Sequence, residues 1–181
     1  MPSHSSPRSR RLLRRSVAAI AAASCRVAAV PTLVAAQALP GFTLWGGPGP
    51  ERELRYVLDY GNSRVPYDRY RLRIPRQNLA INQIVVDYPE HFDGGFDPDA
   101  IEVRYRRSQE SIPLKAVNWD PDSYVVEMFP EEPIPAGEEL EIVMSSVRPP
   151  DPGMYNFNCK ILSPGDQPLL RYIGTWVLSI G

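Results

Sequence analysis

The chain has 181 residues, which is enough for one ordinary domain and a leader but short for two domains. Its formal charge is −1, but six basic residues and no acidic residue precede Leu39, whereas 14 basic and 21 acidic residues follow, a balance of −7. Such an acidic segment repels nucleic acid and anionic lipid at long range, so neither is expected as a general partner.

Residues 1–38 have the composition of an export leader. A Ser- and Arg-rich start precedes the apolar run 17–25, and the tripeptide 36–38 has the small-x-small form of a cleavage site. The segment 9–13 also approaches a twin-arginine signal, which would imply export after folding. We therefore expect a signal peptide over residues 1–38 and an exported mature chain with no transmembrane span.

Two other interpretations of the leader stay open. Residues 17–38 would serve as an uncleaved membrane anchor if insertion tolerated Arg26, which costs about 2.5–3.5 kcal/mol, and the break at Pro31. Alternatively, residues 22–25 resemble a lipoprotein cleavage box ending at Cys25. If the leader is removed after Ala38, Cys159 is the one remaining cysteine and no internal disulfide can form.

Residues 39–52 are rich in glycine and proline and indicate a connector before a folded domain at 53–181. In that domain, apolar residues recur at every second position along short runs, which turns one face of each strand toward a core. We predict about eight or nine strands. The runs span residues 53–60, 68–74, 81–88, 101–105, 112–118, 124–129, 140–144, 155–161 and 172–180.

This pattern predicts an all-β fold, a single immunoglobulin-like antiparallel β-sandwich. Asp-Pro-Asp at 97–99 and at 120–122 each introduce a strand, because Asp and Pro suit the first positions of a type I turn. The residues Asp151, Gly153 and Tyr155 resemble the Asp-x-Gly-x-Tyr corner of immunoglobulin-like domains. We expect them to be structural, with the Tyr155 hydroxyl bonded to an upstream backbone group.

Residues 133–181 carry a second set of motifs. They are the Pro-Ile-Pro-Ala-Gly run 133–137, the strand 141–144, the Pro pair 149–150, the Gly-x-Tyr-x-Phe pattern 153–157, the Pro-Gly pair 164–165 and the Tyr-Ile-Gly-Thr run 172–175. Together they resemble the C-terminal half of a cyanobacterial family of exported proteins of unknown function. The resemblance implies an exported, β-rich domain from an oxygenic phototroph, and no catalytic residue or cofactor can be carried over from it.

Five arginines alternate along two predicted strands and form the first candidate site. They are Arg69, Arg71 and Arg73 on one strand, and Arg104 and Arg106 on another. If the two strands are neighbours, the guanidinium groups form a patch suited to carboxylate, sulfate or phosphate, as in an anionic envelope glycan. The alternative is that each arginine faces an acid across the sheet, for instance Glu139 or Glu141.

The acidic, glycine-containing loop 87–99 is the second candidate site. Its carboxylates Asp93, Asp97 and Asp99 suggest a weak calcium site, because calcium takes about six to eight oxygen ligands in a flexible cage. The spacing does not match an EF-hand. The alternative is a solvated turn, since Asp and Gly are ordinary turn residues. No other cofactor is expected.

The tryptophans offer a third feature. Trp119 ends a predicted strand and Trp45 lies in the connector, where an indole can stack on a sugar or cover the end of the sandwich. By strand parity, Trp176 and Cys159 are expected in the core, where a cysteine behaves as a small apolar residue. His91, the one histidine after the leader, lies in the loop 87–99, so nucleophilic catalysis is not expected.

These observations favour a non-enzymatic, exported binding or structural module of the cell envelope, periplasm or extracellular space. Its partner would be an envelope glycan or an envelope protein, and exposed edge strands would also permit strand addition. Two other functions stay open. A catalytic or accessory domain would act on an extracellular polysaccharide through the acids of 87–99, and a photosynthesis-associated subunit of the thylakoid lumen would carry the same kind of leader.

Overall fold

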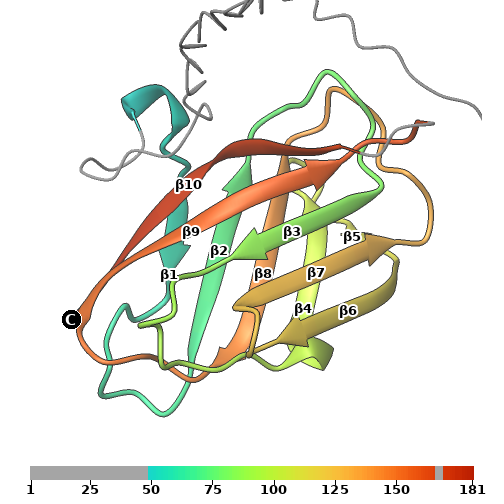
Figure 1. Cartoon of the computed structure of the whole chain (residues 1–181). Coiled ribbons are helices and arrows are strands. Elements are labelled where there is room, and N and C mark those ends of the chain that lie inside the picture. Colours follow the sequence, from blue (N-terminus) through green and yellow to red (C-terminus); the bar gives the residue numbers. More distant parts are fainter. Residues whose placement is uncertain (1–48, 166–168) are drawn as a thin grey trace, which may run out of the picture. The chain divides into compact units, whose positions relative to one another are not determined.

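The structure is a computed structural model that describes residues 49–165 and 169–181. Over these residues the chain forms ten β-strands and two short 3₁₀ turns, and the strands make two antiparallel sheets of five that pack as a sandwich (Figure 1). The prediction of an all-β sandwich is confirmed. The predicted leader 1–38, with Cys25, and the connector up to residue 48, with Trp45, lie outside the described residues. In the described part, no helix is long and apolar enough to cross a membrane.

The first sheet has the strand order β1-β2-β8-β4-β5. Its strands are β1 (Tyr56–Leu58), β2 (Asp68–Ile74), β8 (Leu140–Val147), β4 (Ile101–Tyr105) and β5 (Ser111–Ile112). The second sheet has the order β10-β9-β3-β7-β6. Its strands are β10 (Leu170–Ile180), β9 (Gly153–Leu162), β3 (Gln83–Asp87), β7 (Val125–Pro130) and β6 (Leu114–Asp120). The 3₁₀ turns are η1 (Pro50–Arg52) and η2 (Pro98–Ala100).

The chain passes repeatedly between the two sheets, so strands that follow one another in sequence are often not neighbours in space (Figure 1). β8 inserts between β2 and β4, and β9 inserts between β3 and β10. These long-range pairings fix which loops meet at each end of the sandwich. The predicted run 112–118 is two strands, because Pro113 has no N–H to donate and interrupts the ladder.

The core lies between the sheets and follows the predicted alternation. In β2 the side chains at Tyr70, Leu72 and Ile74 are fully buried, while the arginines between them face outward. Phe157, Cys159 and Ile161 of β9 are also fully buried, as is Trp176 of β10. The Trp176 Nε1–H donates to the Arg73 carbonyl oxygen at 3.1 Å, which satisfies the one polar atom of this side chain.

The buried hydroxyl of Tyr70 has no hydrogen-bond partner among the described residues. Burial raises its pKa, and the nearby Asp68 and Tyr155 raise it further. Tyr155, by contrast, donates its hydroxyl to the Asp151 carbonyl oxygen at 2.7 Å, an upstream backbone group.

We expect Tyr70→Phe to leave the free energy of unfolding unchanged or to raise it by up to about 1 kcal/mol, because it removes an unsatisfied buried polar atom. The matched variant Tyr155→Phe should lose about 1 kcal/mol, because it removes a formed hydrogen bond. Urea denaturation measures both. Equal losses in the two variants would mean that the Tyr70 hydroxyl has a partner.

Candidate functional site

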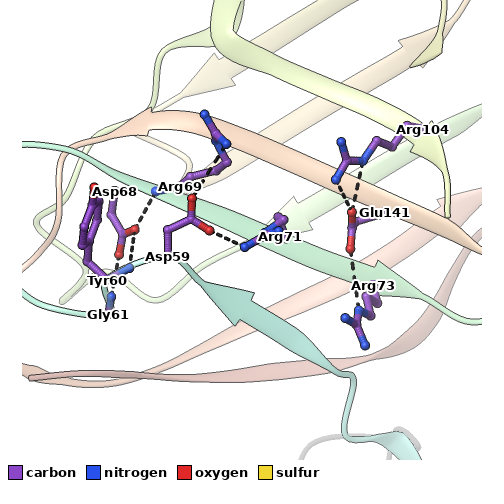
Figure 2. Close-up of polar contacts among 9 residues, drawn as sticks. All are labelled: Asp59, Tyr60, Gly61, Asp68, Arg69, Arg71, Arg73, Arg104 and Glu141. Carbon is purple, nitrogen blue, oxygen red and sulfur yellow. Dashed lines mark hydrogen bonds and ion pairs between the residues drawn. The ribbon is translucent and has the colours of Figure 1, made fainter. Parts of the chain in front are cut away.

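The five predicted arginines lie on the outer face of the first sheet, but β2 and β4 are not neighbours, because β8 lies between them. Glu141 of β8 stands in register with Arg73 on one side and Arg104 on the other (Figure 2). Arg104 donates Nη2 and Nε to Glu141 Oε2 at 2.6 and 3.1 Å, and Arg73 Nε lies 3.6 Å from Oε1. Glu141 is only 5% exposed, so the pair of guanidinium groups encloses a buried carboxylate.

The remaining three arginines also lie beside acids. Asp59, after β1, pairs with Arg71 and lies 3.8 Å from Arg69 (Figure 2). Arg106 Nη1 lies 3.5 Å from Glu139 Oε1. This arrangement matches the alternative in which each arginine faces an acid, although Asp59 was not anticipated as a partner. Anion binding by these five side chains stays a prediction, since each guanidinium already has a carboxylate within 4 Å.

The carboxylate of Asp68, at the start of β2, stabilises the β1–β2 loop through hydrogen bonds. This buried carboxylate accepts the backbone N–H groups of Tyr60, Gly61 and Arg69 at 3.0, 2.8 and 2.6 Å (Figure 2). These bonds hold both ends of the β1–β2 loop, which carries Tyr67. The sequence shows an acid at this position but no signal for the loop geometry.

The loop 87–99 closes one end of the sandwich instead of extending into solvent. Its residues Tyr88, Phe92 and Phe96 are buried, and they pack on one another and on Phe157 of the core. The ring centroids of Phe92 and Phe157 are 5.0 Å apart in an edge-on arrangement. The middle of the loop is therefore a structural plug, and the expectation of a solvated turn holds only for its charged side chains.

Two of the three acids predicted to bind calcium already accept backbone N–H groups. Asp93 Oδ1 accepts the Asp151 N–H at 3.0 Å, and Asp97 Oδ1 accepts the Asp99 N–H at 3.1 Å as the cap of η2. Within residues 49–165 and 169–181, no three His, Cys, Asp or Glu side chains gather closely enough to hold a metal ion. The calcium site thus stays a prediction from the sequence without geometric support.

Arg148, which follows β8, holds the loop in place. Its carbonyl oxygen accepts the Gly95 N–H at 3.0 Å, and its own N–H donates to the Gly95 carbonyl oxygen at 2.9 Å. Its Nη2 also donates to the carbonyl oxygens of Asp93 and Gly94 at 3.2 and 3.4 Å. Of the three residues predicted to bind calcium, Asp93 is therefore placed by contacts to the β8–β9 connection.

A hollow of about 540 Å³, here named the end hollow, lies beside this loop. It is lined by Tyr67, Gly95, Phe96, Asp97, Trp119, Ser146 and Arg148. Of these, the sequence had singled out Asp97 and Trp119, each for a separate reason. Sequence reasoning misses Tyr67, Ser146 and Arg148, because no local motif links the β1–β2 loop and the end of β8 to Asp97 or Trp119.

The aromatic side chains of the end hollow are held in different ways. Trp119 is half-buried at the end of β6, and its Nε1–H donates to the Tyr88 hydroxyl at 2.7 Å. Phe96 packs edge-on against the Trp119 ring at 5.7 Å between centroids. Tyr67 is 61% exposed, although it is a large aromatic residue. The hollow therefore has one fixed indole and one solvent-accessible phenol.

Ser146 adopts a left-handed backbone conformation, with φ of 57°. It lies where β8 bulges against β2, since the register between them shifts between Asp68 and Tyr70. A non-glycine residue in this region stores about 1–3 kcal/mol of strain, and such strain concentrates at functional sites. The bulge places Ser146 on the wall of the end hollow.

Cys159 and His91 do not form a poised nucleophile. Cys159 is fully buried, and burial raises the pKa of its thiol, with the charge of Asp87 acting in the same direction. His91 is exposed, and its ring stacks on Tyr155 with 5.3 Å between centroids. A buried neutral thiol is a packing group, so this cysteine offers no reactive thiolate.

Three solved structures are similar to this chain at low sequence identity. The collagen-binding domain of a Staphylococcus aureus adhesin has 7% identity and a TM-score of 0.41, covering 70% of this chain and 95% of that one. The bacterial hydrophobin BslA has 12% identity and a TM-score of 0.44, covering 75% and 98%. The RrgA Jo.In complex has 11% identity and a TM-score of 0.41, covering 74% and 84%.

Sequence comparison gives the family. No curated protein matches the chain at the sequence level. The family model described as a protein of unknown function, DUF2808, matches residues 44–180, which include all ten strands. The chain therefore belongs to the DUF2808 family.

Proposed function

We propose that this protein is a non-enzymatic, exported binding module of the cell envelope that holds its partner in the end hollow. One observation carries the proposal. Two aromatic side chains from distant segments, Trp119 of β6 and Tyr67 of the β1–β2 loop, meet at a hollow of about 540 Å³ that also presents Arg148 and Asp97. Aromatic rings beside a few polar groups are typical of recognition sites.

The end hollow is organised before any ligand arrives. The hydrogen bond from Trp119 to Tyr88 and the edge-on contact with Phe96 fix the plane of the indole. The loop 87–99, which contributes Gly95, Phe96 and Asp97 to the hollow, is held by the backbone pairing of Gly95 with Arg148. A site with fixed groups loses less conformational entropy on binding, which favours affinity.

The polar groups of the hollow favour binding over hydrolysis. Glycoside hydrolases act through two carboxyl groups on either side of the scissile bond. Asp97 is the one carboxylate among the residues that line the end hollow, and it already caps η2. Asp93, another acid of the same loop, accepts the Asp151 N–H. The composition of residues 1–38 supports delivery of the domain to the envelope.

Site-directed photo-crosslinking in the producing cells tests this function. A photoreactive phenylalanine at Tyr67 should join the protein to one recurring envelope component, and Trp119→Ala should lower the yield severalfold. The same group at Glu110, an exposed residue in the β4–β5 turn, is the control and should give no recurring product. Equal products from both positions, or none from Tyr67, would refute a partner in the end hollow.

A further inference from the structure

We infer that the end hollow recognises a carboxylated sugar, the uronic acid unit of a glycan. The sugar ring would stack on Trp119 and Tyr67, and its carboxylate would pair with Arg148. This inference rests on the proposed function, because it assigns a ligand class to the same hollow. Three features of the site support it: the charge of Arg148, which no carboxylate neutralises, the position of its guanidinium beside the indole, and the neighbouring polar groups.

Arg148 differs from the arginines of the outer sheet face. Those five each have a carboxylate within 4 Å, as in the pair between Arg104 and Glu141 at 2.6 Å. Arg148 has no carboxylate within that distance among the described residues. Its Nη2 donates to two backbone carbonyl groups, which position the guanidinium but do not neutralise it. Its charge therefore stays available to an anion, and guanidinium binds carboxylate with well-defined geometry.

The guanidinium and the indole approach the same point of the hollow. A Cβ atom placed on Gly95 would lie 3.4 Å from Arg148 Nε and 3.6 Å from Trp119 Cη2. Gly95 itself is buried, so these distances show that the guanidinium and the indole lie next to each other on the wall of the end hollow. One sugar unit in the hollow can therefore contact the aromatic ring and the guanidinium together. A uronic acid carries both complementary groups, an apolar ring face and a carboxylate, in one residue.

The remaining polar groups suit sugar hydroxyls. Ser146 is exposed on the wall of the hollow and can both donate and accept a hydrogen bond. Asp97 Oδ1 accepts the Asp99 N–H, and the second oxygen of this carboxylate can accept from a hydroxyl. The net negative charge of the domain opposes anionic ligands, but this repulsion is screened beyond about 8 Å at physiological ionic strength. The short contact to Arg148 therefore decides the preference.

Calorimetric titration of the full-length protein tests the inference. The probes are oligomers of galacturonate, glucuronate, mannuronate and guluronate, each beside its neutral, carboxyl-reduced counterpart. At least one uronate oligomer should bind about tenfold more tightly than its reduced form, the expected loss of one charge-assisted pair. Trp119→Ala should abolish binding and Arg148→Lys should weaken it several-fold, because lysine keeps the charge but not the planar fork. Arg107→Lys, at an exposed position on the β4–β5 turn, is the matched control and should bind as the parent does.

The outcomes separate this inference from the proposed function. Equal affinity for a uronate and its reduced form would overturn the inference, and so would no binding of any probe. If the crosslink from Tyr67 then identifies a protein partner, the binding function stands and only the ligand class fails. If Tyr67 gives no product either, both fail. Should Arg148→Lys unfold, the comparison of the acidic and reduced oligomers with the parent protein still decides.

Discussion

Replacing Glu141 by alanine should lower the free energy of unfolding by about 3 kcal/mol. Glu141 is 5% exposed and lies between Arg73 and Arg104, whose side chains are 28% and 21% exposed. Without the carboxylate, two partly buried guanidinium groups face each other across β8 with nothing to balance them. Removing one member of a buried ion pair costs about 3–5 kcal/mol, and the partial exposure of the arginines places this case at the lower end.

Two further variants show whether charge is the cause. Glu139→Ala removes the acid that pairs with the half-exposed Arg106, and it should cost at most about 0.5 kcal/mol. Replacing all three members together, as Arg73→Met, Glu141→Leu and Arg104→Met, should recover most of the loss, because no unbalanced charge remains. Thermal and urea denaturation at one ionic strength give the values. A loss at Glu139 as large as that at Glu141 would contradict the buried-pair explanation.

Replacing Gly94 by alanine should destabilise the protein by about 2–3 kcal/mol and should also disturb the end hollow. A Cβ atom at this position would lie 2.5 Å from the Phe92 ring and 2.7 Å from the Arg148 carbonyl oxygen. Phe92 is packed in the aromatic plug, and Arg148 is held by its backbone pairing with Gly95, so neither can move freely. The loop 87–99 must shift instead, and with it the wall of the hollow.

Gly165→Ala is the matched control for this prediction. Among the described residues, no atom lies within 4 Å of a Cβ built at Gly165, so its free energy of unfolding should change by no more than a few tenths of a kcal/mol. The fluorescence of Trp119, measured in a variant with Trp45 and Trp176 replaced by Phe, should change in Gly94→Ala. A Gly94→Ala variant with parent-like stability would show that the loop is not packed against Arg148 as described.

The strand boundaries show how far local pattern reaches. The runs 68–74 and 101–105 match β2 and β4 residue for residue, because strict alternation with outward arginines leaves one register for burial. The run 112–118 fails at Pro113, whose missing N–H divides it between two sheets. Alternation of apolar residues predicts each strand separately, so it does not predict that the chain passes from one sheet to the other at Pro113.

The arginines show that alternation along a strand predicts which face a side chain occupies but not its ion-pair partner. The alternation along β2 correctly places Arg71 and Arg73 on one face of the sheet. Whether each guanidinium has an acidic partner depends on which strand lies beside β2. That strand, β8, brings Glu141 from a segment far along the chain. The same limit applies to Arg148, because Trp119 and Tyr67, the aromatic residues that share the end hollow with it, lie far from it in the sequence.

The acids and glycines of the loop 87–99 predict a solvated turn, because such residues favour turns in isolation. Phe92 and Phe96 determine its place instead, because packing these two aromatic rings against Phe157 removes their apolar surface from water. The predicted leader 1–38 and the compartment stay predictions, since they rest on residues outside the described part of the chain.

The all-β class and the inward face of the strands follow from the amino-acid sequence, because side chains alternate between the two faces of a strand wherever that strand is placed. The strand order, the ion pairs of the outer face, and the meeting of Tyr67, Trp119, Ser146 and Arg148 at one hollow become visible only in the packed fold. These depend on which distant segments pack together, and that choice follows from the energy of the whole core, which no single stretch of the chain encodes.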